Sequence, residues 1–357
     1  MSYDPFARGP HPVGVRSFEP TDAARGRTLP LEVWYPAAEA HRGADLSPET
    51  QDTYQVLALF PGAPQAAVRD AEPAPLPRGR APVVVFSHGF GGHRRQTTFL
   101  CTHLASHGYV VAAPDHVGNT VADMMQTFMD VQAGKPLPDP DALLGSMIAA
   151  RPADASFVLD WLLGGGAAGV SELADAARVG ISGHSFGGWT TLVTASRDPR
   201  VRAALPLAPA GGASPLPANP LRESVETSWQ RELPCLYLVA DRDTLLPLEG
   251  MRELYGRTPA PKRMAVLRRS DHMHFCDRVE QTHEMFRMLP KVDRFAGTPD
   301  IPPISELVPG EHAYAFVRGL GLAHFDAALR EHEAAAKLLS GDLVGLLAER
   351  GVAIDVL

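Results

Sequence analysis

Residues 177–197, ARVGISGHSFGGWTTLVTASR, decide the fold of this chain. A short apolar run, Val179 to Ile181, leads into a glycine-rich turn with Ser185 at its tip, and a helical pattern with Trp189 on one face follows. A strand, a tight turn that carries a serine, and a helix form the context in which Gly-x-Ser-x-Gly makes a nucleophile elbow. The stretch therefore predicts that Ser185 is a nucleophile.

The glycines around Ser185 have a physical reason in this interpretation. A serine at the tip of such a turn takes a strained backbone conformation, and neighbours without a Cβ let the strand and the helix pass closely. The start of the helix also offers a backbone N–H group and the positive end of a dipole to a developing oxyanion. The alternative interpretation is a glycine-rich helix start with no catalytic role.

Length and composition exclude several classes of protein. The 357 residues can bury a large core, and the formal net charge of −8 argues against a nucleic-acid partner. The first 14 residues lack the apolar centre of a signal peptide, and we see no apolar run long enough to cross a bilayer. We expect a cytoplasmic protein with three free cysteines, no integral membrane segment and no cofactor.

Apolar runs that alternate with helical patterns predict an α/β fold with a mostly parallel central sheet and helices on both faces. An antiparallel N-terminal hairpin is expected over 13–18 and 31–35, and a helix over 151–163. We expect one domain over 1–357, with a catalytic core at about 9–290 and a mainly helical extension at about 300–357. Further strands are expected at 82–86, 109–114, 179–181, 201–207, 234–240 and, as the last strand, 264–267.

A nucleophilic serine needs a base, and the base needs an orienting acid. In α/β-hydrolases the chain order is serine, acid, histidine. After Ser185, the acids at a strand end are Asp241 and Asp243, and the histidines after the last expected strand are His272 and His274. The residues alone leave both pairs open.

The chain resembles α/β-hydrolases of the platelet-activating factor acetylhydrolase and "predicted dienelactone hydrolase" group, which are related to cutinase-like polyester hydrolases. The similarity runs from about residue 9 to 290. The segments that carry it are Val84-Val85-Phe86-Ser87-His88-Gly89-Phe90-Gly91-Gly92, Leu104 to Ala113, Gly183 to Gly188, and the aspartate and histidine segments.

The resemblance implies a cofactor-free serine esterase with Ser185 as nucleophile and His272 as base. It implies that the backbone N–H groups of Phe90 and Phe186 form the oxyanion hole, and it favours Asp243 as the acid, with Asp241 bracing the turn. The expected substrate is a short-acyl ester or an acetylated or oxidised phospholipid, and a cutinase-like polyester is the alternative. Dienelactone hydrolases use a cysteine nucleophile where this chain has Ser185, so that substrate is not expected.

Other assignments remain open. Candidates for substrate binding are His93, His184, Trp189, Met124 and Phe128, with ordinary packing as the alternative. If residues 272–276 were extended, His272, His274 and Cys276 would share one side, a spacing that suits zinc. A zinc-dependent hydrolase is therefore the rival enzyme class, and a binding protein without catalysis is a third class. The acyl chain length and the oligomeric state are not specified by the sequence.

Overall fold

A computed structural model describes residues 3–56, 61–77, 79–213, 220–226, 229–288 and 300–357. The chain divides into two compact units: residues 8–181, and residues 1–7 together with 182–357. The single domain expected over 1–357 stays a prediction. Residues 289–299, between the expected catalytic core and the expected helical extension, lie outside the described residues.

The unit of residues 8–181 is built on strands with the order β10–β8–β9–β4–β1–β7. Strands β8 and β9 are parallel, whereas β4 runs antiparallel to both β9 and β1. The expected N-terminal hairpin is confirmed, with Val13 opposite Pro36 and Phe18 opposite Leu31. The strands are β1 (Val13–Phe18), β4 (Leu31–Pro36), β7 (Val68–Arg69), β8 (Ala81–Ser87), β9 (Val110–Pro114) and β10 (Ala174–His184).

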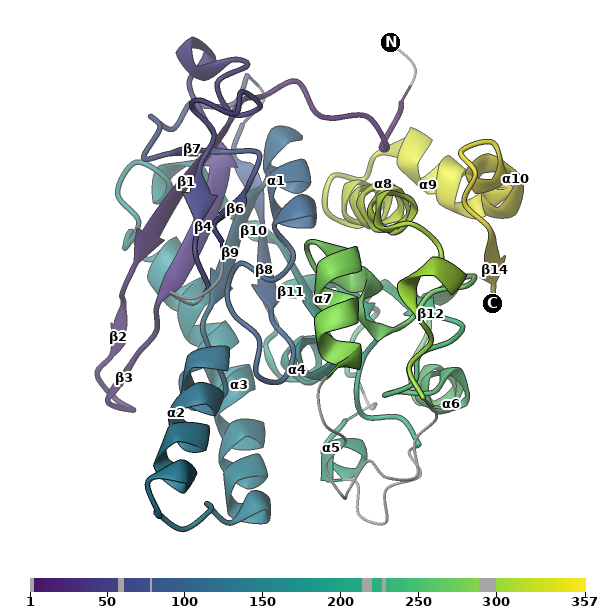
Figure 1. The fold of residues 1–357 in the computed structure, drawn as a ribbon. Helices are drawn as coiled ribbons and strands as arrows, with labels where there is room; N and C mark the ends of the chain where they lie inside the picture. Colours follow the sequence, from purple (N-terminus) through teal and green to yellow (C-terminus); the bar gives the residue numbers. More distant parts are fainter. Residues whose placement is uncertain (1–2, 57–60, 78, 214–219, 227–228, 289–299) are drawn as a thin grey trace. The chain divides into compact units, whose positions relative to one another are not determined.

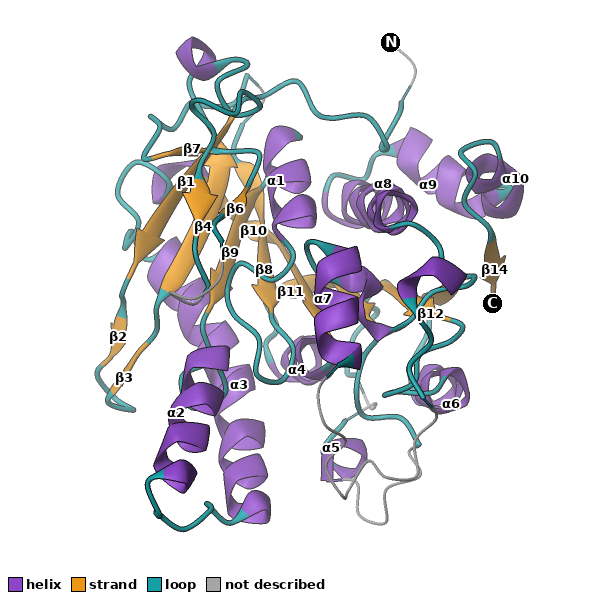
Figure 2. Cartoon of the chain, viewed as in Figure 1, coloured by secondary structure: helices purple, strands orange, loops and turns teal. Residues whose placement is uncertain are grey.

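Every residue of β4, β8 and β9 is buried, as expected for strands covered on both faces. The helices of this unit are α1 (Thr98–Ser106), α2 (Val121–Gln132) and α3 (Pro140–Leu163), visible in Figure 1 and Figure 2. The helix expected over 151–163 therefore begins eleven residues earlier, at Pro140. Asp139 caps it, and a proline at the first helical position is compatible with the helix. Short elements complete the unit: β2 (Thr21–Asp22), β3 (Arg27–Thr28), η1 (Glu39–His41), β5 (Thr53–Tyr54), β6 (Ala63–Pro64) and η2 (Ser171–Leu173).

The unit that contains residues 182–357 has the strand order β11–β12–β13–β14. Strands β11 (Val201–Leu207), β12 (Cys235–Ala240) and β13 (Lys262–Leu267) are parallel, so their carboxyl ends share one edge. Its helices are α4 (Phe186–Arg197), α5 (Pro220–Glu223), α6 (Leu248–Arg257), η3 (His272–Phe275), α7 (Val279–Arg287), η5 (Ile304–Glu306), α8 (Gly310–Leu329), α9 (Glu333–Ser340) and α10 (Leu343–Ala348). The mostly parallel sheet with helices is thus confirmed.

Strand β13 is not the last strand of the chain, which corrects that prediction. A short strand at the C-terminus, β14 (Ile354–Val356), pairs antiparallel with β13 and places Ile354 opposite Leu267. Only Ile354 of its three residues is buried, so β14 has too little apolar pattern to be recognised in the sequence. The segment 300–353 before it is mainly helical, as expected.

Helix α3 bears on the prediction that no apolar run is long enough to cross a bilayer. Within the described residues, this 24-residue helix is long and apolar enough to cross a membrane by length and composition alone, with a mean hydropathy of 1.2. Core helices of globular proteins reach the same length and hydropathy. Its buried residues include Arg151 and Asp154, which hydrogen-bond to other elements of their own unit.

The close approach of α4 to the loop after β11 requires a glycine at position 188. A Cβ there would lie 2.7 Å from the backbone Cα of Pro209. We therefore expect Gly188→Ala to lower the free energy of unfolding by about 1–3 kcal/mol, measured by chemical denaturation.

The matched control is Gly256→Ala in α6, where an added Cβ meets no atom within 4 Å. That substitution should be neutral or stabilise by up to about 1 kcal/mol, because alanine is the better helix former. A Gly188→Ala protein as stable as the wild type would show that the α4 contact yields easily.

Candidate active site

Ser185 lies between the end of β10 and the start of α4, where the sequence predicts the elbow. Its backbone has φ 59° and ψ −117°, a strained conformation for a residue with a side chain. The strain is held by backbone hydrogen bonds: Ser185 N–H donates to Leu207 O over 2.9 Å, and Ser185 O accepts from Trp189 and Ala210. Among residues 179–195, Ser185 is the only one that is not buried. The turn therefore presents one hydroxyl from an otherwise buried segment.

Asp243 and His272 form a buried pair on the loops that follow β12 and β13. The distance from His272 Nδ1 to Asp243 Oδ2 is 2.7 Å, and both side chains are almost inaccessible, at 4% and 0% exposure. The other carboxylate oxygen, Oδ1, accepts the backbone N–H groups of Leu245 and Leu246. Three donors thus fix the carboxylate, which in turn fixes the plane of the imidazole.

This environment changes the pKa of His272. Burial by itself lowers the pKa, because it penalises the imidazolium ion. The attraction and the hydrogen bond of Asp243, together with the charge of Asp271, outweigh burial and raise the pKa above the usual value of 6.5. His272 is therefore a stronger base than a free histidine.

Asp241 and Asp271 hold the two loops in place. Asp241 accepts the N–H of Ser270 over 3.1 Å and lies 3.6 Å from Arg268 Nε. Among the described residues it makes no hydrogen bond or ion pair with His272, so it braces the turn. Asp271 Oδ1 accepts the N–H groups of both His272 and Thr244, at 2.7 and 2.9 Å. This carboxylate joins the acid loop to the base loop. Sequence reasoning missed its role, although an aspartate directly before a helical turn is a common N-cap signal.

His184, the residue before Ser185, connects the elbow to the base segment. Its ring lies 4.5 Å from the ring of His272, and its Nε2 is 3.0 Å from the carbonyl oxygen of His272. Only an N–H can pair with a carbonyl, so Nε2 is the donor. Burial lowers the pKa of His184 well below its ordinary value, and the ring is neutral. The strained turn and the base are thereby brought together inside one unit.

The zinc interpretation fails on geometry. Residues 272–275 form a 3₁₀-helix, not an extended strand, so alternate side chains do not share one side. His274 is 3.0 Å from both Asp271 N and Val308 O through its two nitrogens, while Cys276 Sγ lies 3.7 Å from His184 Nδ1. No group of three or more metal-ligating side chains occurs among the described residues.

The substrate-binding candidates lie in different places. In the unit of Ser185, His184 and Trp189 are buried, and Trp189 Nε1 donates to Leu221 O over 2.9 Å. In the unit of residues 8–181, Met124 and Phe128 lie on α2 with 38% and 59% exposure, and His93 lies half-buried on the loop after β8. Their substrate contacts stay predictions.

The two proposed oxyanion donors also belong to different units. Phe186 begins α4, directly after Ser185, whereas Phe90 lies on the loop after β8 with a half-exposed side chain. Their pairing in one oxyanion hole stays a prediction.

Comparison with known proteins gives the relationship of the chain. The family model for "Platelet-activating factor acetylhydrolase, isoform II" matches residues 6–140. The chain is 29% identical to cutinase est1 of Thermobifida alba over 198 residues, which is 55% of this chain and 54% of that protein. It is 31% identical to a platelet-activating factor acetylhydrolase of Cavia porcellus over 161 residues, 38% of this chain and 37% of that protein. The chain spans about half the length of the curated cutinases it matches.

A solved structure extends the similarity over both units. A ferulic acid esterase from Streptomyces cinnamoneus superimposes with a TM-score of 0.64 at 28% identity, over 90% of this chain and 91% of that one. Parallel strands, the strained serine turn and these matches agree. The chain has the α/β-hydrolase fold and is related to cutinases and platelet-activating factor acetylhydrolases.

Proposed function

We propose that the protein is a serine-dependent carboxylic ester hydrolase with Ser185 as nucleophile, His272 as general base and Asp243 as the orienting acid. One observation carries the proposal: a strained, half-exposed serine stands next to a histidine ring that contacts the buried Asp243–His272 pair. A nucleophile, a base and an orienter in this chain order are the parts that acyl transfer needs.

The reaction proceeds in two halves. Ser185 Oγ attacks the ester carbonyl carbon while His272 Nε2 takes the hydroxyl proton, and the carbonyl oxygen becomes an oxyanion. The backbone N–H groups of Phe186 and Phe90 are the proposed donors to that oxyanion. Collapse breaks the bond to the alcohol, which leaves with the proton from His272. Water then attacks the acyl-enzyme by the same route and releases the acid, and the Nδ1–H bond to Asp243 stabilises the imidazolium each time.

The substrate class we propose is a short-acyl ester or an acetylated or oxidised phospholipid, in line with the family model over residues 6–140. A cutinase-like polyester is the alternative, which the match to cutinase est1 favours. The ferulic acid esterase similarity over 90% of the chain adds ferulate esters to the compounds that should be tried.

Replacement of the nucleophile tests the mechanism. Ser185→Ala should lower kcat by about 10⁶-fold, because the other two residues act only through this hydroxyl. A fluorophosphonate probe should label the wild type at Ser185 alone, which mass spectrometry of the peptides will show. The thermal midpoint of the variant serves as the folding control, and labelling that persists in Ser185→Ala would refute the assignment.

The pH profile tests the acid and the base together. His272 must be neutral to accept the proton, so kcat/KM is lost as pH falls through its pKa, which Asp243 and Asp271 hold above 6.5. Asp243→Asn removes the attraction but leaves the burial, so the acid limb should move to lower pH while kcat falls about 10⁴-fold.

Asp241→Asn is the matched control, since within the described part of the chain this carboxylate pairs with Ser270 and Arg268 and not with the imidazole. The Asp241→Asn variant should keep the position of the acid limb of the kcat/KM profile and most of the activity. If the Asp241 variant is the more damaged of the two, the roles of the aspartates are reversed.

A substrate series tests the proposed class. We expect kcat/KM for p-nitrophenyl esters to be highest for acetate and butyrate and to fall by about tenfold or more towards palmitate, measured below the micellar concentration. Methyl ferulate and amorphous polyester film are the comparison substrates. A maximum at palmitate, or faster release from the film than from the acetate, would replace the short-acyl assignment.

A further inference from the structure

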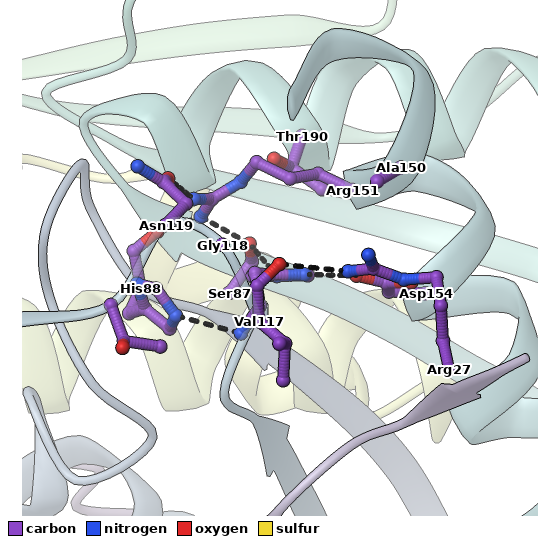
Figure 3. A network of polar contacts seen from close by, with 12 residues as sticks. Arg27, Ser87, His88, Val117, Gly118, Asn119, Ala150, Arg151, Asp154 and Thr190 are labelled. Carbon is purple, nitrogen blue, oxygen red and sulfur yellow. Dashed lines mark hydrogen bonds and ion pairs between the residues drawn. The ribbon is translucent and has the colours of Figure 1, made fainter. Parts of the chain in front are cut away.

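A chain of serine, histidine and aspartate, distinct in its residues from the proposed triad, lies buried in the unit of residues 8–181. Figure 3 shows its Ser87 and Asp154 together with Arg151. Ser87 Oγ is 2.9 Å from His116 Nε2, and His116 Nδ1 is 3.1 Å from Asp154 Oδ2. Ser87 ends β8, His116 follows β9, and Asp154 lies on α3. The connectivity is that of a catalytic triad, yet the three residues are 0%, 1% and 0% exposed.

The protonation states follow from the partners. Burial alone would raise the pKa of Asp154, but the hydrogen bonds from His116 and Arg27 and the charge of Arg27 lower it to about 2, so the carboxylate is ionised and only accepts. Burial and the charge of Arg151 lower the pKa of His116 to about 4, which keeps its ring neutral. His116 Nδ1–H therefore donates to Asp154, and His116 Nε2 accepts from the hydroxyl of Ser87.

Arg151 occupies the remaining side of Ser87. Its Nη2 donates to Ser87 Oγ over 3.2 Å and makes a short hydrogen bond to the carbonyl oxygen of His88, while Nη1 makes a short hydrogen bond to Asn119 Oδ1. The hydroxyl of Ser87 thus donates to His116 and accepts from the guanidinium of Arg151, and the residue has no exposed surface. A serine without exposed surface cannot attack a substrate. Any effect of this network on catalysis must therefore come from the loop that it positions.

The loop that Arg151 holds is the one that carries Phe90. His88 Nε2 accepts the N–H of His116 over 3.0 Å, so its Nδ1 carries the proton and donates to Gly89 O over 2.7 Å. Gln96 Oε1 accepts the N–H of Gly89 over 2.9 Å. These hydrogen bonds fix the side chain of His88 and the backbone of Gly89, the two residues before Phe90.

The amide of Phe90 differs from those before it. Within the described part of the chain, its N–H has no acceptor, and its side chain is 51% exposed. An oxyanion donor needs an N–H group that no other acceptor occupies, and it needs a backbone that is held in one orientation.

We propose that Arg151 is a positioning residue that sets the direction of the Phe90 amide through the carbonyl of His88. The inference rests on the proposed function, because it gives Phe90 its role as an oxyanion donor. The planar fork of the guanidinium reaches Ser87, His88 and Asn119 at once. A lysine ammonium has no such fork, so Arg151→Lys keeps the charge and loses the geometry.

The test compares Arg151→Lys and Arg151→Met with the wild type on p-nitrophenyl acetate. We expect kcat to fall about 10- to 100-fold in Arg151→Met and by a smaller factor in Arg151→Lys, with KM within about threefold, because a displaced donor weakens the transition state more than substrate binding. The inhibition constant of an alkyl trifluoromethyl ketone, which forms an oxyanion adduct with the serine, should rise by the factor by which kcat/KM falls.

Arg25→Met is the matched control. Arg25 joins the same cluster through a 2.7 Å bond to Asp154, and within the described residues its hydrogen bonds go to Asp22, Ala150 and Asp154 and not to residues 87–92. It should lower the thermal midpoint and leave kcat within about twofold of the wild type.

Two outcomes would overturn the proposal. If Arg151→Met loses thermal stability as Arg25→Met does but keeps kcat, Arg151 is structural only. If the Arg151→Lys variant does not fold, Arg151 is required for the stability of its unit and not for positioning Phe90. Failure of the proposed function looks different, since the wild type itself would then bind neither the ketone nor a fluorophosphonate at Ser185.

Discussion

The hydrogen bond between Asp243 and His272 is the interaction on which the site depends. It spans 2.7 Å between side chains that are almost fully buried, where an unpaired charge would be costly. The surroundings of the pair follow from this requirement. Two backbone N–H groups hold the second carboxylate oxygen, Asp271 joins the two loops, and His184 fixes the carbonyl of His272. The pKa of His272 is raised because Asp243 is held at this distance and Asp271 adds its charge.

The buried chain of Ser87, His116 and Asp154 shows that connectivity alone does not make a catalytic site. Burial lowers the pKa of His116 to about 4, and the hydroxyl of Ser87 is engaged by Arg151. The pKa of His272 is raised instead, and Ser185 stands on a strained turn as the only residue of its segment that is not buried. Access and pKa, more than residue type, separate a structural network from a catalytic one.

The comparisons fall differently on the two units. The family model covers residues 6–140, which hold the Phe90 loop and part of the Arg151 network but none of the proposed triad. The ferulic acid esterase structure covers 90% of the chain and therefore both units. The family model thus matches the unit that carries the Phe90 loop, whereas the similarity to the ferulic acid esterase includes the unit that carries Ser185.

The sequence by itself determined the strand–turn–helix around Ser185, the hairpin and the order of serine, acid and histidine, because apolar periodicity and turn glycines act over a few residues. It left Asp241 and Asp243, and His272 and His274, open, and the resemblance alone favoured one of each. The tertiary structure decided which groups touch. Asp243 and His272 are 29 residues apart, His116 and Asp154 are 38 apart, and His88 and Arg151 are 63 apart. Contacts at such separations depend on how strands and helices pack, and no local pattern encodes them.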